Sequence, residues 1–381
     1  MKRHTKQRRS VSPKQRRASG RKSRPRRTRR IKQKSIQRGR TWRVSTPAEL
    51  AASGYHLGRL LAGVYPLQLA EVSGARPDPD GLAVYKMDMG ALWGRHANTL
   101  GITKLLGEDY AAAAASFALG YCEERGLSDQ GWLPLPTHRT TAAVVKLRKD
   151  AGAAETAALL RELNRIPLNE LILVPEDGMH PVREEIRALI PPGAKFLESD
   201  GKEDLGDGGL FSRIQSDLVL VLETGCASKA EDLVPFVLLI SSGIDIALSD
   251  SSSDMPLFHQ REDREIVKQF VNYSLGRGDL LADSLTAVPH AMSRQAIEMI
   301  GDHLSDPAKA HAAALLGGLA VASVDNRGKR KQARGRRPLY ASVDLSSAGA
   351  HLEGLRLAME KKGSRILYPD NWRKREYAAD R

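Results

Sequence analysis

The segment Asp217-Leu-Val-Leu-Val-Leu-Glu-Thr-Gly225 determines the fold class that the sequence predicts. Its five consecutive apolar residues, Leu218 to Leu222, lie between polar residues. A run of this kind is typical of a short strand that is buried on both faces of a parallel sheet. The strand ends at the carboxylate of Glu223. Ligands of open α/β sheets bind beyond the carboxyl ends of the strands, so a nucleotide or a metal ion is expected at this point.

On both sides of this segment, strand-like runs alternate with helical patterns. Strands are predicted at 141–147, 170–174, 194–197 and 244–248, with helices at 153–163, 182–190 and 231–240. Two further helices are indicated, one that opens at Asp306-Pro307 and one that runs from Ser346 or Ser347 to Lys362. Alternation of strands and helices predicts βαβ units with right-handed crossovers. The expected fold class is α/β, with a mostly parallel sheet flanked by helices.

The positive charge of the chain is concentrated at its N-terminus. The formal net charge is +14, but residues 1–43 contain 20 Lys and Arg and no Asp or Glu. The remainder holds 39 Lys and Arg against 45 Asp and Glu, a net charge of −6. Residues 1–43 are therefore expected to be a disordered basic tail. One interpretation of the tail is electrostatic binding to an anionic polymer such as nucleic acid, or to an anionic membrane surface. The alternative is a solubilising tail without a specific partner.

Two further regions are expected after the tail. Residues 44–136 are predicted to form a helical subdomain and a linker, because apolar residues recur at helical spacing. Residues 137–381 are predicted to form the α/β domain, with an exposed basic loop at 327–337.

Composition and missing motifs exclude several classes of protein. The two cysteines, Cys122 and Cys226, form no CxxC pair, so a disulfide framework and a cysteine-based zinc site are not expected. No apolar run is long enough for a transmembrane segment, and no apolar region follows the N-terminal charges as in a secretory signal. A cytoplasmic protein is expected. The sequence also lacks the P-loop, HExxH and GxSxG motifs.

Carboxylates follow several of the predicted strands. Asp150 follows the strand at 141–147, Glu176 and Asp177 follow the strand at 170–174, and Glu223 ends the central strand. Since the carboxyl ends of parallel strands meet at one edge, these side chains are expected to lie close together. They could hold a ribose, or a divalent cation that bridges a diphosphate. Alternatively they are ordinary turn and N-cap residues, because helix N-termini favour negative charge.

Three segments carry a family resemblance. Residues 144–150 read Val-Val-Lys-Leu-Arg-Lys-Asp, residues 166–174 read Ile-Pro-Leu-Asn-Glu-Leu-Ile-Leu-Val, and the central strand ends in Glu223-Thr-Gly225. In this order they resemble bacterial family 2 glycosyltransferases of the GT-A fold, over roughly residues 82–381 and most closely over 141–300.

The resemblance implies an activity and a set of ligands. The chain would transfer a sugar from a nucleotide-sugar donor to an acceptor, which could be a polysaccharide, a lipid or a protein. Glu223 would bind Mg²⁺ or Mn²⁺ on the donor, while Asp150, Glu176 and Asp177 would bind the nucleotide. A general base would also be needed for the acceptor hydroxyl, and Asp283 and Glu353 are candidates by position. The alternatives are a loop-capping aspartate and a glutamate on a helix surface.

The motifs of the chain depart from those of the family in three loops. Gly225 stands where the family's Asp-x-Asp motif has a second carboxylate, His180 replaces an aspartate, and Lys149 replaces an asparagine. The hydrophobic strands and helices are retained, which is the pattern of a degenerate transferase domain. Three hypotheses follow. The chain is a glycosyltransferase, a catalytically impaired homologue that acts as a binding or scaffold protein, or an anionic-polymer binding protein that acts through its tail.

Overall fold

The structure is a computed structural model, and the residues that it describes belong to one compact unit, Ser45–Arg381. The described residues are 46–65, 79–97, 108–128, 131–176, 184–188, 190–191, 193–196, 207–226, 228–252, 255–324 and 346–366. The predicted basic tail, Asp177, His180 and the predicted basic loop lie outside them. No helix within these ranges combines the length and the hydropathy that crossing a membrane requires.

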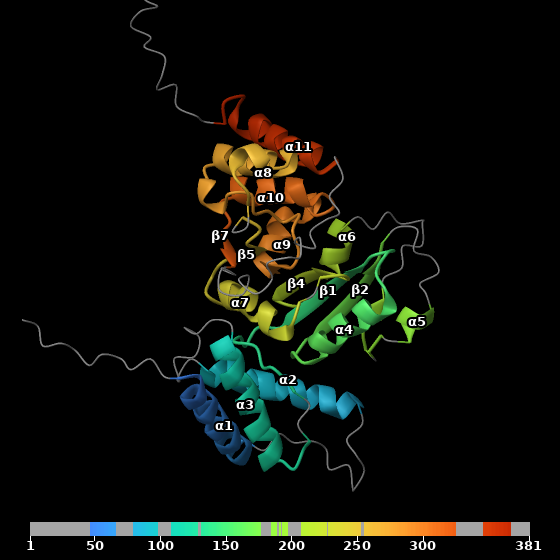
Figure 1. The fold of residues 1–381 in the computed structure, drawn as a ribbon, viewed down its shortest axis with the longest axis vertical. Helices are drawn as coiled ribbons and strands as arrows, with labels where there is room; N and C mark the ends of the chain where they lie inside the picture. Colours follow the sequence, from blue (N-terminus) through green and yellow to red (C-terminus); the bar gives the residue numbers. More distant parts are fainter. Residues whose placement is uncertain are drawn as a thin grey trace, which may run out of the picture. The chain divides into compact units, whose positions relative to one another are not determined.

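A seven-stranded sheet forms the centre of the α/β part (Figure 1). The strands in chain order are β1 (Thr141–Leu147), β2 (Glu170–Pro175), β3 (Lys195–Phe196), β4 (Leu218–Glu223), β5 (Ile246–Ser249), β6 (His290–Ser293) and β7 (Val321–Val324). Their order across the sheet is β3-β2-β1-β4-β6-β5-β7. All pairings are parallel except those of β6, which runs antiparallel to β4 and β5. The predicted α/β class with a mostly parallel sheet is confirmed.

Strand β4 is apolar from Leu218 to Leu222 because both of its faces are covered. Leu218, Leu220 and Leu222 join the core that α4 (Ala153–Asn164) and α7 (Ala230–Ser241) cover. Val219 and Val221 point to the other core. That core is covered by α6 (Asp207–Ser212), α9 (Arg294–Ile300) and α10 (Pro307–Leu316). A strand with two buried faces cannot alternate apolar with polar residues, which explains the uninterrupted run.

The helical region that precedes the sheet contains α1 (Pro47–Val64), α2 (Pro79–His96) and α3 (Glu108–Glu124). Helix α1 begins with a capping box in which Thr46 and Glu49 accept from each other's backbone amides. The buried Trp93 Nε1 donates to Tyr110 Oη at 2.6 Å, and Tyr110 Oη donates to the carbonyl of Pro134 at 2.9 Å. The helices are thus attached to the buried segment that leads into β1.

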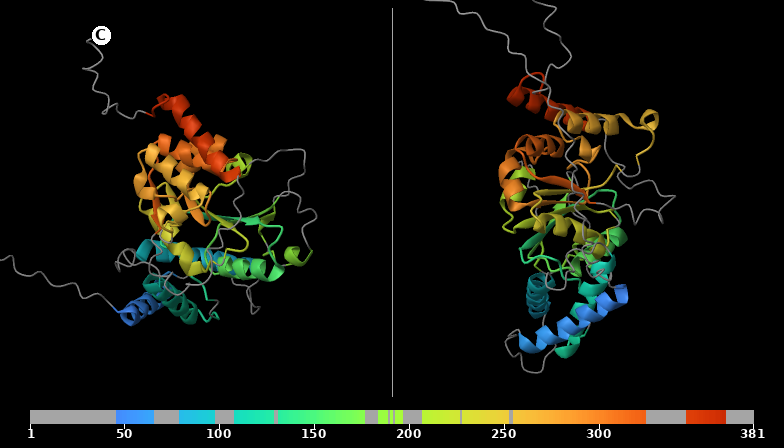
Figure 2. Two further views of the ribbon diagram at one scale, coloured as in Figure 1. Left: turned by 45° about the horizontal axis from the view of Figure 1, so that its top comes forward. Right: turned by 90° about the vertical axis from the view of Figure 1, so that its left-hand side faces the viewer.

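The main differences from the sequence prediction lie beyond β5. Strands β6 and β7 were not predicted, because His-Ala-Met-Ser and Val-Ala-Ser-Val are short and partly polar. Helix α8 (Asp263–Ser274) was also missed. The helix predicted at 182–190 is the single turn α5 (Glu184–Arg187), and the strand predicted at 194–197 is reduced to β3. Helix α11 (Ser346–Lys362) begins and ends as predicted, and it packs across α8 and α10 (Figure 2).

Glu170 holds the amino-terminal ends of neighbouring strands together. Its Oε1 accepts hydrogen bonds from the amides of Gln215 and Ser216, both at 2.9 Å, and from Ser216 Oγ at 2.7 Å. Its Oε2 accepts from Lys195 Nζ at 2.9 Å. Burial alone raises the pKa of Glu170. The hydrogen bonds from Lys195, Ser216 and the two amides outweigh burial and lower this pKa to about 2.

Replacing Glu170 by glutamine is expected to lower the free energy of unfolding at pH 7 by about 2 kcal/mol. Because the folded-state pKa of Glu170 lies below its ordinary value of 4.5, its stabilisation is complete above pH 4.5. The stabilisation is lost as the pH falls from 4.5 towards 2, so the two proteins should converge in acid. Urea denaturation across this range measures the difference, with Glu155→Gln on the exposed side of α4 as the control. A difference that does not depend on pH would contradict the prediction.

Candidate functional site

Three strand ends meet at the carboxyl edge of the sheet. Strand β1 leads into Arg148, Lys149 and Asp150, β2 leads into Glu176, and β4 ends at Glu223. The strands end level because Leu147 pairs with Pro175, and Lys146 pairs with Glu223. This edge was predicted to gather carboxylates, and the structure brings Asp150, Glu176 and Glu223 together there.

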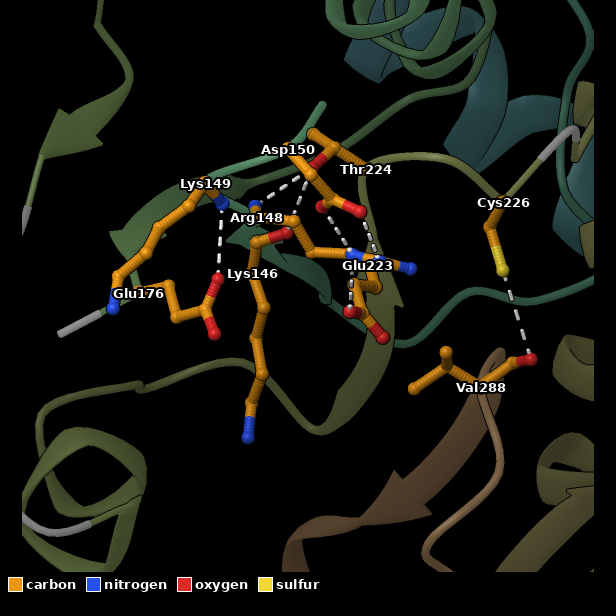
Figure 3. A network of polar contacts seen from close by, with 9 residues as sticks. All are labelled: Lys146, Arg148, Lys149, Asp150, Glu176, Glu223, Thr224, Cys226 and Val288. Atoms are coloured by element: carbon orange, nitrogen blue, oxygen red, sulfur yellow. Dashed lines mark hydrogen bonds and ion pairs between the residues drawn. The ribbon is translucent and has the colours of Figure 1, made fainter. Parts of the chain in front are cut away.

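The guanidinium of Arg148 is the centre of this cluster (Figure 3). Arg148 Nε donates to Asp150 Oδ1 at 2.8 Å, and Nη2 donates to Asp150 Oδ2 at 2.5 Å. Arg148 Nε also lies 3.4 Å from Glu223 Oε1. The carboxylates that follow β1 and β4 thus share one guanidinium. Sequence reasoning took Arg148 as part of a turn and missed this position.

Backbone hydrogen bonds fix the loops that carry the cluster. Thr224 Oγ1 accepts from the amide of Arg148 at 2.8 Å, and the amide of Thr224 donates to the carbonyl of Lys146 at 2.9 Å. Glu176 Oε2 accepts from the amide of Lys149 at 2.9 Å, which connects the end of β2 to the turn after β1. The cluster therefore rests on rigid strand ends.

Gly225 ends the turn after β4 in a conformation that favours glycine. Its φ is +92°, whereas the space around a Cβ at this position is open. An aspartate here would meet no steric clash but would strain the backbone. Glycine at position 225, where the resemblance led us to expect a carboxylate, is therefore consistent with the local backbone.

The electrostatic field at this edge is mixed. Burial raises the pKa of Glu223, and the negative charges of Glu176 and Asp150 raise it further. The positive charges of Arg148 and Lys146 lower it. The net result is a pKa above the ordinary value for a glutamate. Burial, with the charge of Glu223, raises the pKa of the Cys226 thiol to about 11. Cys226 Sγ lies 3.7 Å from the carbonyl of Val288, which accepts its weak hydrogen bond. The thiol is therefore protonated at neutral pH and is a poor nucleophile.

The donor set fits a divalent cation poorly. Mg²⁺ and Mn²⁺ are held by several oxygen ligands, of which carboxylates are the strongest. Within the described part of the chain, no three His, Cys, Asp or Glu side chains are grouped so that they could hold a metal. Glu223, the predicted metal ligand, lies beside a guanidinium. Asp177, a predicted nucleotide ligand, lies outside the described residues.

Asp283, one of the two predicted general bases, is buried in a hydrogen-bond network. Its side chain is 3% exposed. Asp283 Oδ1 accepts from the amide and Oγ of Ser251 and from Ser252 Oγ, each at 2.8 Å. Asp283 Oδ2 accepts from Ser323 Oγ at 2.6 Å. The carboxylate joins the loop after β5 to the adjacent strand β7, and both of its oxygens are engaged.

A second buried network lies behind Asp283. Asn272 Nδ2 donates to the carbonyls of Leu281 and Asp283, both at 2.9 Å, and Asn272 Oδ1 lies 2.8 Å from His311 Nε2. Burial, together with the charges of His351, Lys268 and Arg277, lowers the pKa of His311 to about 3, so the imidazole stays neutral. Leu281 is held at φ +49°, which a leucine rarely adopts. These contacts determine the position of the backbone at Asp283.

Glu353, the other predicted base, lies on α11. Its side chain is half exposed, and one carboxylate oxygen lies 3.8 Å from Arg356. Neither Glu353 nor Asp283 makes a hydrogen bond or ion pair with Asp150, Glu176 or Glu223 in the described structure. The structure thus brings Asp150, Glu176 and Glu223 together, but not the predicted bases.

Comparison with known proteins gives a likeness in fold. No protein-family model matches the sequence, and no curated protein matches it. A glucosyl-3-phosphoglycerate synthase from Mycobacterium tuberculosis, solved with Mn²⁺, UDP and phosphoglyceric acid, is 16% identical, with a TM-score of 0.40. The match covers 61% of this chain and 80% of the synthase. A mannosyl-3-phosphoglycerate synthase from Rubrobacter xylanophilus is 13% identical, with a TM-score of 0.38 over 63% of this chain and 80% of that one.

A synthase of a different kind matches as well. The 4-diphosphocytidyl-2C-methyl-D-erythritol synthase from Anaerococcus prevotii is 10% identical, with a TM-score of 0.34 over 56% of this chain and 96% of that one. Likenesses at such low identity and TM-score carry no conclusion about activity.

Proposed function

We propose that the protein is glycosyltransferase-like, and that a nucleotide-sugar donor binds at the carboxyl edge of β1, β2 and β4. The observation that carries the proposal is the contact of Arg148 with both Asp150 and Glu223, because it joins the loops of two strands at one place. Ligands of parallel sheets bind at this edge. Arginine also pairs with phosphate oxygens through two parallel hydrogen bonds, which suits a diphosphate.

The remaining charged groups of the edge have assigned parts in this proposal. Lys146 and Lys149 add positive charge at the end of β1, which attracts the diphosphate. Glu176 and Asp177 are the proposed acceptors for the ribose hydroxyls, as the resemblance implied. Glu353 remains a candidate base because its carboxylate is exposed. Asp283 is instead assigned a structural part, since its oxygens already accept four hydrogen bonds.

The proposal predicts that the full chain binds at least one of UDP, GDP and dTDP in calorimetric titration. UDP is the first probe because the Mycobacterium synthase was solved with it. Glu223→Ala is expected to weaken binding by about tenfold, since it removes one of the two carboxylates that orient Arg148 (about 1.4 kcal/mol). Glu155→Ala on α4 is the control and should bind as the wild type does. Failure to bind any of the three nucleotides, by a protein that still unfolds cooperatively, would contradict the proposal.

A second candidate function is binding of an anionic polymer through residues 1–43. It is favoured by their 20 basic and no acidic residues. The same nucleotide titration on a chain that lacks residues 1–43 separates the two functions. A donor site at the sheet edge survives this deletion. A catalytically impaired homologue would bind the nucleotide without transferring a sugar.

A further inference from the structure

We propose that the guanidinium of Arg148 takes the place of a divalent cation at this edge, so that the site binds a nucleoside diphosphate without a metal ion. The inference rests on the proposed function, because it assumes that a diphosphate binds here. It assigns the neutralising charge, which the family resemblance gives to Mg²⁺ or Mn²⁺, to a side chain of the protein.

The guanidinium of Arg148 lies between the two carboxylates that would hold a metal ion. Arg148 Nε lies 2.8 Å from Asp150 Oδ1 and 3.4 Å from Glu223 Oε1. A metal ion that used these two carboxylates would have to occupy the space between them, about 2 Å from each ligand oxygen. That space holds the positive end of Arg148. A divalent cation could enter only by displacing the arginine against like-charge repulsion.

Contacts with neighbouring residues hold Arg148 in this position. Its side chain is 21% exposed, and its amide donates to Thr224 Oγ1 at 2.8 Å. Arg148 Nε and Nη2 donate to the two carboxylate oxygens of Asp150 at 2.8 Å and 2.5 Å, and Nε lies 3.4 Å from Glu223 Oε1. The guanidinium is therefore held in place by partners on both strand ends.

Thr224, Gly225 and Cys226, which follow β4, supply no further carboxylate for a metal ion. Gly225 has no side chain, and the Cys226 thiol donates to the carbonyl of Val288, with Sγ 3.7 Å from this oxygen. Thr224 Oγ1 is occupied by the amide of Arg148 and the carbonyl of Lys146. Two carboxylates that already share a cation are a poor site for an ion that takes about six oxygen ligands.

Arg148 can also contact a ligand from this position. Its hydrogen bonds to Asp150 and its ion pair with Glu223 use Nε and Nη2, and Nη1 donates no hydrogen bond to the described residues. A phosphate oxygen at Nη1 would form a charge-assisted hydrogen bond while Asp150 keeps the guanidinium in place. Lys146 and Lys149 of the same strand end supply the long-range attraction.

The test is calorimetric titration of the full chain with UDP, in EDTA and in Mn²⁺, and with Mn²⁺ alone. The wild type should bind UDP in EDTA, and Mn²⁺ should change the affinity less than about twofold. Arg148→Met should weaken UDP binding in EDTA at least about tenfold, because a charged phosphate contact is lost. The same variant should bind Mn²⁺ more tightly than the wild type, since Asp150 and Glu223 are released. Arg161→Met, the same change on exposed α4, should behave as the wild type.

The outcomes separate this inference from the proposed function. If the wild type binds UDP only with Mn²⁺, the inference is overturned and the donor site stands. If Arg148→Met binds UDP in EDTA as well as the wild type does, the inference is also overturned. If UDP, GDP and dTDP all fail to bind, with and without Mn²⁺, the proposed function itself is overturned. Should Arg148→Met fail to fold, Arg148→Lys keeps the charge, and it should bind UDP in EDTA more weakly than the wild type but without a need for Mn²⁺.

Discussion

Replacing Gly58 by alanine is expected to lower the free energy of unfolding by about 3 kcal/mol. A Cβ at Gly58 of α1 would lie 2.2 Å from the carbonyl oxygen of Phe117 and 2.9 Å from the amide nitrogen of Tyr121. Both are backbone atoms of α3, so no side chain can rotate out of the way. The two helices would have to separate along their contact.

The close approach of α1 and α3 extends beyond this one glycine. A Cβ at Gly54 would lie 2.1 Å from the carbonyl oxygen of Ala113, and a Cβ at Gly120 would lie 2.3 Å from that of Tyr55. Glycines on both helices therefore allow backbone-to-backbone contact. Because Trp93, Phe117 and Tyr121 pack in the same core, separation of the helices would also loosen the aromatic cluster.

The control for Gly58 lies in the same helix. A Cβ at Gly63 would meet no atom within 4 Å, so Gly63→Ala changes only the conformational preference of the backbone. This variant is expected to gain up to about 1 kcal/mol, because glycine is less favourable than alanine inside a helix. Urea denaturation of the two variants gives both values. Effects of equal sign and size at the two positions would contradict the close helix contact.

The strands of the sheet could be predicted where burial on both faces produces a continuous apolar run in the sequence. The run that became β4, and the strands β1 and β2 beside it, are continuous apolar segments that end in polar turns. Strand β6 has no such run. It is four residues long, and its pairing with β4 and β5 depends on residues more than forty positions away in the chain.

The sequence predicted the location of the candidate site but not the contacts within it. The rule that ligands bind at the carboxyl edge gave Asp150, Glu176 and Glu223, which the structure brings together. The part of Arg148 depends on the direction of a long side chain at a strand end, and a spacing of two residues from Asp150 does not reveal it. The surroundings of Asp283 depend on Ser251, Ser252 and Ser323, which come from two other segments of the chain.

Replacing Asp283 by alanine is expected to lower the free energy of unfolding by about 3 to 5 kcal/mol. The substitution removes an acceptor from the amide of Ser251 and from the hydroxyls of Ser251, Ser252 and Ser323. These donors are buried or half-buried, and most of them have no other acceptor in the described structure. Asp283→Asn keeps the shape and one acceptor oxygen, so it should cost about half as much.

The same substitutions distinguish the structural part of Asp283 from the predicted part as a general base. If Asp283 has a structural part, its replacement lowers stability, and the nucleotide binding proposed at Arg148 is expected to persist at temperatures where the variant is folded. If Asp283 is instead a general base, its replacement lowers the rate of sugar transfer and leaves the stability unchanged. Glu353→Gln is the matched control, because its half-exposed side chain should contribute less than about 0.5 kcal/mol to stability. If Asp283 joins the loop after β5 to β7, replacing its charged carboxylate, which accepts four hydrogen bonds, must lower the stability. An Asp283→Asn variant that unfolds at the same temperature as the wild type would therefore make Asp283 a catalytic candidate again.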